Sequence, residues 1–150
     1  MEIERKFLIP ALPDNIDSYQ FRIIEQAYLC TEPVVRVRRD NNDYYLTYKS
    51  AGLMVREELN LPLTKNAYEH LIRKADGNII RKKRYLIPSE HNLTIELDIF
   101  EAPFADLLLA EVEFSSVEEA DSYITPDWFG EDVTLDGRYH NSYLSQLDMK

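Results

Sequence analysis

The chain has 150 residues, the size of one domain, and a hydrophobic content of 45%, which is enough to build one core. Twenty-seven acidic residues exceed seventeen basic ones, so the formal net charge is −10 at pH 7. This balance argues against a nucleic acid duplex or an anionic membrane as partner, because both require clustered cations. We expect a single domain over residues 1–150.

Hydrophobic alternation with a period of two recurs along the chain in short segments that end at turn residues. These segments predict about eight strands, over residues 2–8, 20–29, 34–39, 44–49, 54–61, 79–87, 93–100 and 109–114. Most of the strands are joined by short connections, which favour antiparallel hairpins.

Helices are expected to be few. Thr64 is suited to cap a helix that ends before Gly77, and Ser116 opens a short helix with a capping box. One or two turns are expected over residues 103–108, and apolar spacing predicts a last helix within residues 138–147. Many short antiparallel strands with few helices predict a mainly β (α+β) fold, a barrel or a sandwich.

Charged residues within the strands repeat at a spacing of two, which places them on one face of each strand. The set has seven acids and seven bases: Glu2, Glu4, Glu58, Glu96, Asp98, Glu111, Glu113, Lys6, Arg36, Arg38, Lys49, Arg56, Lys82 and Arg84. A sheet with one solvated face accounts for any single pair. On several strands, however, acids follow acids and bases follow bases, although like charges repel.

Closing such a sheet with its charged face inward would create a lumen lined by carboxylates and cations. Enclosed charges are costly unless they are paired or bind a ligand. Glu-x-Glu pairs supply hard oxygen ligands for Mg²⁺ or Mn²⁺, and Arg-x-Arg pairs match phosphate oxygens. The pattern therefore predicts a metal-dependent site for a short chain of phosphates.

Other features indicate the compartment. Cys30 is the single cysteine and cannot close an intramolecular disulfide, and no Cys/His spacing resembles a zinc site. The first residues have no cationic segment followed by an apolar run, and no stretch approaches ~18 apolar residues. We expect a soluble cytoplasmic protein. His70, His91 and His140 are isolated, which favours surface or structural roles over catalysis.

Six motifs in order resemble the triphosphate tunnel metalloenzymes, or CYTH domains, over nearly the whole chain. The opening Glu-Ile-Glu-Arg-Lys is similar to the N-terminal Glu-x-Glu-x-Lys signature of this family. The other five motifs lie at residues 35–38, 46–49, 82–85, 95–100 and 110–114, and residues 127–141 are similar to the C-terminal segment of the family.

This resemblance implies an eight-stranded antiparallel closed β-barrel, a tunnel with a few helices packed outside, and hydrolysis of inorganic triphosphate to pyrophosphate and phosphate. It implies metal ligation by Glu2, Glu4, Glu111 and Glu113, with Glu96 and Asp98 assisting through water. The implied phosphate-binding residues are Lys6, Arg36, Arg38, Lys49, Arg56, Lys82 and Arg84. Glu4 or Glu113 would orient the attacking water, and Lys6, Arg56 and Glu58 complete the expected catalytic set.

One position departs from the family pattern, since Asn60 stands where members often have a third charged residue in Arg-x-Glu-x-Glu. Asn60 either changes how this strand handles metal and water or only caps the strand. Three alternative functions therefore stay open: a thiamine triphosphatase, a class IV adenylate cyclase, and a non-catalytic polyphosphate-binding module. We expect a small-molecule triphosphate as partner, no nucleic acid duplex, no membrane, and a monomer or homodimer.

Overall fold

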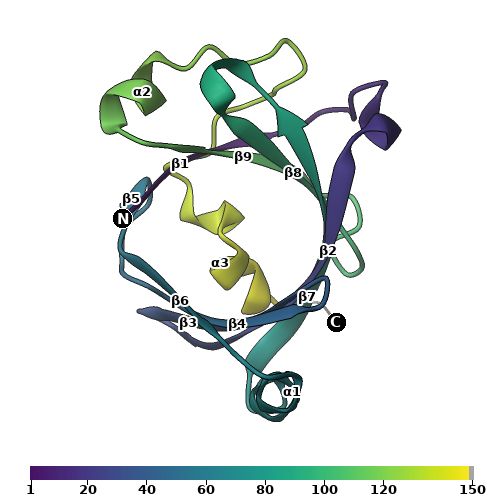
Figure 1. Cartoon of the computed structure of the whole chain (residues 1–150), viewed down its shortest axis with the longest axis vertical. Coiled ribbons are helices and arrows are strands. Elements are labelled where there is room, and N and C mark those ends of the chain that lie inside the picture. Colours follow the sequence, from purple (N-terminus) through teal and green to yellow (C-terminus); the bar gives the residue numbers. More distant parts are fainter. Residues whose placement is uncertain (149–150) are drawn as a thin grey trace.

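A computed structural model describes residues 1–148, and one antiparallel sheet of nine strands forms a nearly closed barrel in it (Figure 1). The strands are β1 (Glu2–Leu8), β2 (Gln20–Thr31), β3 (Val34–Asp40), β4 (Asp43–Lys49), β5 (Val55–Arg56), β6 (Glu58–Pro62), β7 (Asp76–Pro88), β8 (Thr94–Phe100) and β9 (Leu108–Phe114). Their order across the sheet is β5-β1-β9-β8-β7-β2-β3-β4-β6.

A single segment of chain closes the ring. β5 pairs with β1 at one edge of the sheet, β6 pairs with β4 at the other edge, and only Glu57 separates β5 from β6. The strand predicted over residues 54–61 is therefore split in two, because its two halves pair with different partners. The predicted antiparallel barrel is confirmed, and its eight predicted strands become nine because of this division.

The helices are short. They are α1 (Lys65–Ile72), α2 (Val117–Ser122) and α3 (Asn141–Ser145), with 3-10 turns η1 (Ile16–Ser18), η2 (Glu90–Asn92) and η3 (Gly137–Tyr139). The predicted caps are confirmed: Thr64 accepts a hydrogen bond from the Ala67 backbone N–H, and Ser116 accepts one from that of Glu119. Residues 102–106 form turns and a bend without a helix, and Leu108 already begins β9. None of the helices within residues 1–148 is long and apolar enough to cross a membrane.

Part of the outer face of the sheet is apolar and covered by helices and by the C-terminal segment. Ile3 and Phe7 of β1 are buried together with residues of β8 and β9, and Ala120 of α2 packs on them. Phe129 from the C-terminal segment adds a ring whose centroid lies 4.8 Å from that of Phe7. On the other side of the barrel, Tyr68 of α1 is buried against β2–β4. The inner face is therefore left to the charged residues.

Two helices, α1 and α2, pack outside the barrel as expected, whereas α3 lies within the ring of strands (Figure 1). Leu144 of α3 joins a buried apolar cluster with Tyr28, Ile80 and Leu109 at one end of the lumen. The amide oxygen of Asn141 accepts hydrogen bonds from Lys82 Nζ at 2.8 Å and from Gln26 Nε2 at 3.1 Å. The C-terminal segment therefore forms a floor inside the barrel. Leu144 attaches α3 to the apolar end of the lumen, and Asn141 binds polar side chains of the charged part.

Gly77 allows this segment to approach the sheet. It lies in β7 with φ +73, and a Cβ there would overlap the carbonyl oxygen of Ser145. We expect Gly77→Ala to lower the free energy of unfolding by about 3 kcal/mol, through backbone strain and overpacking. Gly137→Ala is the matched control, since its Cβ would meet only a side-chain atom at 3.9 Å. Urea denaturation measures both, and equal stabilities would contradict the close approach.

Candidate active site

The charged face of the sheet encloses a cavity of about 310 Å³. Among the described residues, eight basic and seven acidic side chains line it: Lys6, Arg22, Arg36, Arg38, Lys49, Arg56, Lys82, Arg84, Glu2, Glu4, Asp40, Glu58, Glu96, Glu111 and Glu113. Thirteen of the fourteen residues predicted from the sequence are thus brought together. Asp98 is the exception, and Arg22 and Asp40 are additions.

Acids and bases come from different parts of the sheet. The neighbouring strands β1, β9 and β8 supply most of the carboxylates, and Glu4 lies directly opposite Glu113 in the β1–β9 register. The neighbouring strands β7, β2 and β3 supply most of the cations, and Arg22 lies opposite Arg84 in the β2–β7 register. The cavity therefore has an acidic wall suited to metal and a basic wall suited to phosphate.

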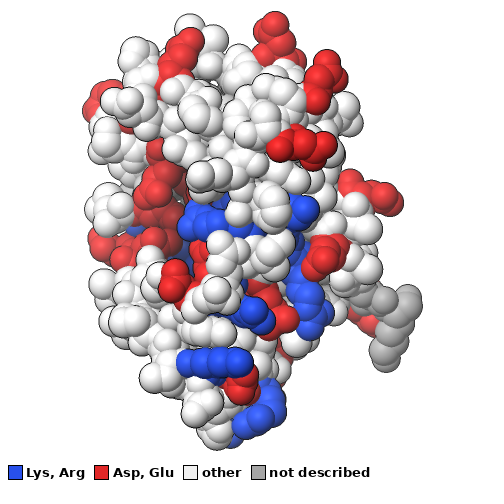
Figure 2. All heavy atoms as spheres, turned by 45° about the vertical axis from the view of Figure 1, so that its right-hand side comes forward, with Lys and Arg blue, Asp and Glu red and all other residues white. Residues whose placement is uncertain are grey.

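The acidic surplus lies elsewhere on the molecule. Outside the cavity lining, the sequence has nine basic and twenty acidic residues. On the face that Figure 2 shows, acidic side chains are spread widely, while basic ones gather in its middle and lower parts. The acidic surplus outside the lining disfavours a polyanion there by repulsion, but not in the lumen.

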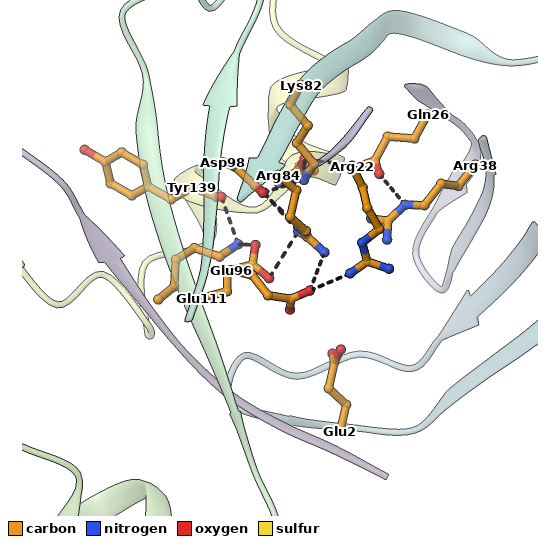
Figure 3. A network of polar contacts seen from close by, with 12 residues as sticks. Glu2, Arg22, Gln26, Arg38, Lys82, Arg84, Glu96, Asp98, Glu111 and Tyr139 are labelled. Carbon is orange, nitrogen blue, oxygen red and sulfur yellow. Dashed lines mark hydrogen bonds and ion pairs between the residues drawn. The ribbon is translucent and has the colours of Figure 1, made fainter. Parts of the chain in front are cut away.

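Asp98 lies behind the cavity wall and holds two of its cations (Figure 3). Its Oδ1 accepts from Arg84 Nε at 2.7 Å, its Oδ2 accepts from Arg84 Nη2 at 2.9 Å, and Lys82 Nζ lies 2.8 Å from Oδ2. Burial opposes ionisation, but Arg84 and Lys82 lower the pKa of Asp98 overall. Asp98 was expected to assist metal binding through water; its side chain is 0% exposed and both of its oxygens are engaged, so it instead anchors two cations.

Arg22 was not anticipated from the sequence because no like charge stands two residues away from it. Its Nη1 donates to Asp40 at 3.1 Å, and its Nη2 donates to Glu96 at 3.4 Å. Glu96 also accepts from Arg84 Nη1 at 3.1 Å, so Arg22 extends the same network toward β3 (Figure 3). The signal that could have revealed Arg22 is the shared inner face of even-numbered residues in β2.

The carboxylates of the acidic wall are crowded. Burial, followed by repulsion from Glu111 and Glu2, raises the pKa of Glu4 well above its usual range. Glu111 is also buried, but Lys6 at 3.6 Å and Arg84 at 3.8 Å hold its pKa well below the usual range. Glu4 is therefore a buried carboxyl whose ionisation is disfavoured, although Lys49 and Lys6 partly oppose that effect.

This crowding fits the divalent metal that the fold implies. Within residues 1–148, no three His, Cys, Asp or Glu side chains are already gathered to hold a metal ion. The donor chemistry is nevertheless suitable, because Glu2, Glu4, Glu111 and Glu113 all offer hard oxygen atoms to the cavity. A cation between them would relieve the repulsion that raises the pKa of Glu4.

The segment that closes the barrel adds a second group of contacts. Lys49 Nζ lies 3.0 Å from Glu2 Oε1 and 3.2 Å from Glu58 Oε2. Burial opposes ionisation of Glu58, but the charge of Lys49 and hydrogen bonds from Glu2, Lys49 and Asn60 together outweigh burial and lower the pKa to about 2. Asn60 lines the cavity, accepts from Thr47 Oγ1 at 2.6 Å and donates to Glu58 at 3.1 Å. Asn60 is thus part of the cavity wall, where it orients a carboxylate.

The cations of the basic wall lack sufficient negative partners. Burial, together with Arg36 and Arg84, lowers the pKa of Arg38 to about 9. Burial also lowers the pKa of Lys82 to about 7, although Asp98 acts in the opposite direction. Among the described residues, the buried Nε atom of Arg36 has no hydrogen-bond partner. A ligand with several negative charges would satisfy all three side chains.

Uncharged residues complete the lining and were also missed by the sequence analysis. Tyr28 lies in the basic wall, and His140, Asn141 and Ser142 line the cavity from the C-terminal segment. A wider groove of about 630 Å³ adjoins the cavity and shares Arg22, Glu96 and Glu113 with it. The segment 138–142 could not be placed from periodicity because it sits inside the barrel.

A barrel whose charged lumen has one acidic and one basic wall defines a class of protein, and the family comparison agrees. The CYTH domain model matches residues 1–144, so the chain belongs to the CYTH domain family. The predicted family and fold are confirmed.

Particular relatives are close in length and sequence. An inorganic triphosphatase of Nitrosomonas europaea is 36% identical over 147 residues, covering 96% of each chain. An inorganic triphosphatase of Acetivibrio thermocellus is 34% identical over 152 residues, covering 95% of this chain and 92% of the relative. A crystal structure of the inorganic triphosphatase NE1496 has a TM-score of 0.73 at 34% identity, covering 99% of this chain and 96% of that chain.

Proposed function

We propose that this protein is a metal-dependent hydrolase that cleaves inorganic triphosphate to pyrophosphate and phosphate. The observation that carries the proposal is the cavity itself, where a wall of underpaired cations faces a wall of crowded carboxylates. Relatives that match nearly the whole chain are inorganic triphosphatases, which supports the same substrate.

The basic side chains would bind and align the phosphates. They are Lys6, Arg36, Arg38, Lys49, Arg56, Lys82 and Arg84. Arg36 is suited to this task because its Nη2 already donates to Thr47 at 3.3 Å while its Nε stays without a partner among the described residues. Phosphoryl transfer depends mainly on such positioning and on charge stabilisation.

The acidic wall would hold the metal. Glu2, Glu4, Glu111 and Glu113 would ligate it, and Glu96 would assist through water. Mg²⁺ or Mn²⁺ is the proposed ion because both prefer oxygen donors. When bound, the metal would offset negative charge on the phosphates.

Glu4 or Glu113 would orient the water that attacks the terminal phosphorus. The two residues lie opposite each other in the register, and burial raises the pKa of both carboxyls, which suits them to accept a proton. Attack forms a new P–O bond, the bond to the bridging oxygen breaks, and pyrophosphate leaves. Lys6 and Arg56 line the same cavity, where their charges would stabilise the reacting phosphate.

The organic triphosphate alternatives would require a place for the organic group, and the adjoining groove of about 630 Å³ is one candidate next to the cavity. Three carboxylates line that groove: Glu96, Glu113 and Glu119. The relatives do not favour a thiamine triphosphatase, a cyclase or a binding module. Cytoplasmic location and a monomeric or homodimeric state stay predictions.

A substrate panel tests the proposal. We expect phosphate release to be fastest with inorganic triphosphate, slower with ATP and thiamine triphosphate, and absent in EDTA. Arg36→Gln is expected to raise KM for triphosphate by about 10–100-fold, the cost of losing a charge-assisted phosphate contact. Release is measured with Mg²⁺ and with Mn²⁺.

Arg39→Gln is the matched control, because Arg39 follows on the same strand but is exposed and does not line the cavity. Its KM should equal that of the unchanged protein. Tight triphosphate binding without any metal-dependent release would instead identify a polyphosphate-binding module. Faster release from ATP or thiamine triphosphate would assign the corresponding organic substrate.

A further inference from the structure

His140 occupies an unusual place between two short helical turns. It follows η3 and caps the start of α3 with extended backbone, φ −70 and ψ 139, so that the predicted helix over residues 138–147 is interrupted there. Together with Asn141 and Ser142, its side chain lines the floor of the cavity. Within residues 1–148 the hydrogen bonds of His140 all involve its backbone, so the imidazole is available to a ligand.

Cations face His140 from several elements. The charges of Lys6 of β1, Arg56 of β5 and Lys49 of β4 lower the pKa of its imidazole, and the charge of Glu111 of β9 raises it. Lys6 is fixed close by, since its Nζ donates to the carbonyl oxygen of Tyr139 at 3.1 Å. Burial, followed by Lys6 and Arg56, lowers the pKa of His140 to about 4. In the free protein the imidazole is therefore neutral near pH 7.

A triphosphate in the cavity would raise the pKa of His140. Its negative charges would offset those of Lys6 and Arg56, which otherwise disfavour a second positive charge. An opposite charge within ~4–6 Å typically raises the pKa of an imidazole by about 1–3 pH units. The cavity floor would then favour the charged imidazolium, which can donate hydrogen bonds from both nitrogens.

We propose that His140 is a substrate-binding residue that takes up a proton when triphosphate enters the cavity and then donates a hydrogen bond to a phosphate oxygen. The identity of the ligand rests on the proposed function. The role of His140 goes beyond that function, because His140 is not among the residues assigned there to phosphate, metal or water.

The proposal links triphosphate affinity to pH. If the pKa of His140 returns on binding from about 4 to the ordinary value of 6.5, the bound form holds one more proton between these values. Affinity then rises as pH falls through 6.5, by about tenfold at pH 5.5 and by less than twofold at pH 7.5. Above pH 7.5 the contribution of His140 vanishes.

Histidine NMR tests the proton uptake without any turnover. The protein is labelled with ¹⁵N-histidine, kept in EDTA, and titrated with pH in the absence and presence of inorganic triphosphate. We expect the pKa of His140 to rise by about 2 pH units or more on binding. His70 and His91 are exposed and outside the cavity, so triphosphate should leave their signals unchanged. His140→Gln identifies the signal.

Calorimetry supplies the second measurement. Triphosphate is titrated in EDTA at pH 5.5 in buffers of different ionisation enthalpy, which gives the number of protons taken up. The unchanged protein should take up about one proton more than His140→Gln, whereas His70→Gln should match the unchanged protein. His140→Lys supplies a permanent cation and should keep the affinity while losing the extra proton.

The outcomes separate the two proposals. If triphosphate binds but the pKa of His140 does not rise and the proton uptake equals that of His140→Gln, the role of His140 is refuted and the proposed function stands. If triphosphate binds neither in EDTA nor with Mg²⁺ or Mn²⁺, both proposals fall. Because the protonation of triphosphate itself is common to every variant, it cancels in the comparison.

Discussion

Asp98→Asn is expected to lower the free energy of unfolding by about 3 kcal/mol, the cost of removing one partner from a buried ion pair. The substitution leaves Lys82 and Arg84 buried without the carboxylate that contacts both, while the shape of the side chain is retained. Urea denaturation measures the loss. Asp121→Asn is the control, because Asp121 is exposed on α2 and should change stability by less than about 0.5 kcal/mol.

The effect of Asp98 should depend on pH in a defined direction. The pKa of Asp98 is lowered in the folded protein from its ordinary 3.8, so its charge stabilises the fold above that value. This contribution is lost as pH falls through the lowered folded pKa. The difference between the unchanged protein and Asp98→Asn should therefore be present above pH 3.8 and shrink in strong acid.

Triphosphate should restore part of the lost stability, because its charges can replace the missing carboxylate beside Lys82 and Arg84. This behaviour separates an anchoring role from a metal-binding one. An Asp98→Asn variant that is as stable as the unchanged protein but needs much more metal for activity would contradict the anchoring role.

Most of the inner wall could be predicted because alternation fixes which residues of a strand share a face. Once Glu2 or Arg36 is placed inside, every second residue of that strand follows. Alternation does not show how far a side chain on the inner face lies from the cavity. Asp98 lies on the inner face, yet its register opposite Arg84 buries it under two cations. Alternation could not distinguish a metal ligand from a residue that anchors cations.

Residues contributed by the C-terminal segment were not predictable. Helical spacing in residues 138–147 indicates an amphipathic segment but not which side of the sheet it meets. Leu144 finds apolar partners inside the barrel, and Asn141 satisfies Lys82 there. His140 was expected to be a surface or structural residue for the same reason, and only the path of the chain places it on the cavity floor.

Glu4→Gln is expected to lower kcat/KM for triphosphate by at least about 100-fold while keeping the fold at least as stable. Glutamine has the same shape but offers no negative charge to metal and accepts no proton from water. Glu4 forms no ion pair within residues 1–148, and burial and repulsion from Glu111 and Glu2 disfavour its ionisation. Replacing this carboxyl by an amide should therefore cost activity without costing stability.

The sign of the stability change follows from the raised pKa of Glu4. The folded protein holds a proton on Glu4 that the unfolded chain releases above the ordinary value of 4.5, so ionisation of Glu4 weakens the fold as pH rises. The gain from glutamine should be largest at pH 7–8 and absent below 4.5. Thermal or urea unfolding at pH 4 and at pH 7.5 measures this difference.

Glu57→Gln provides the matched control for both measurements. Glu57 lies between β5 and β6, is exposed, and does not line the cavity. Its replacement should change neither kcat/KM nor the metal concentration that gives half-maximal release. If Glu4→Gln kept full turnover and an unchanged metal requirement, Glu4 would be neither a metal ligand nor the residue that orients water, and Glu113 would remain opposite it as the carboxylate for that task.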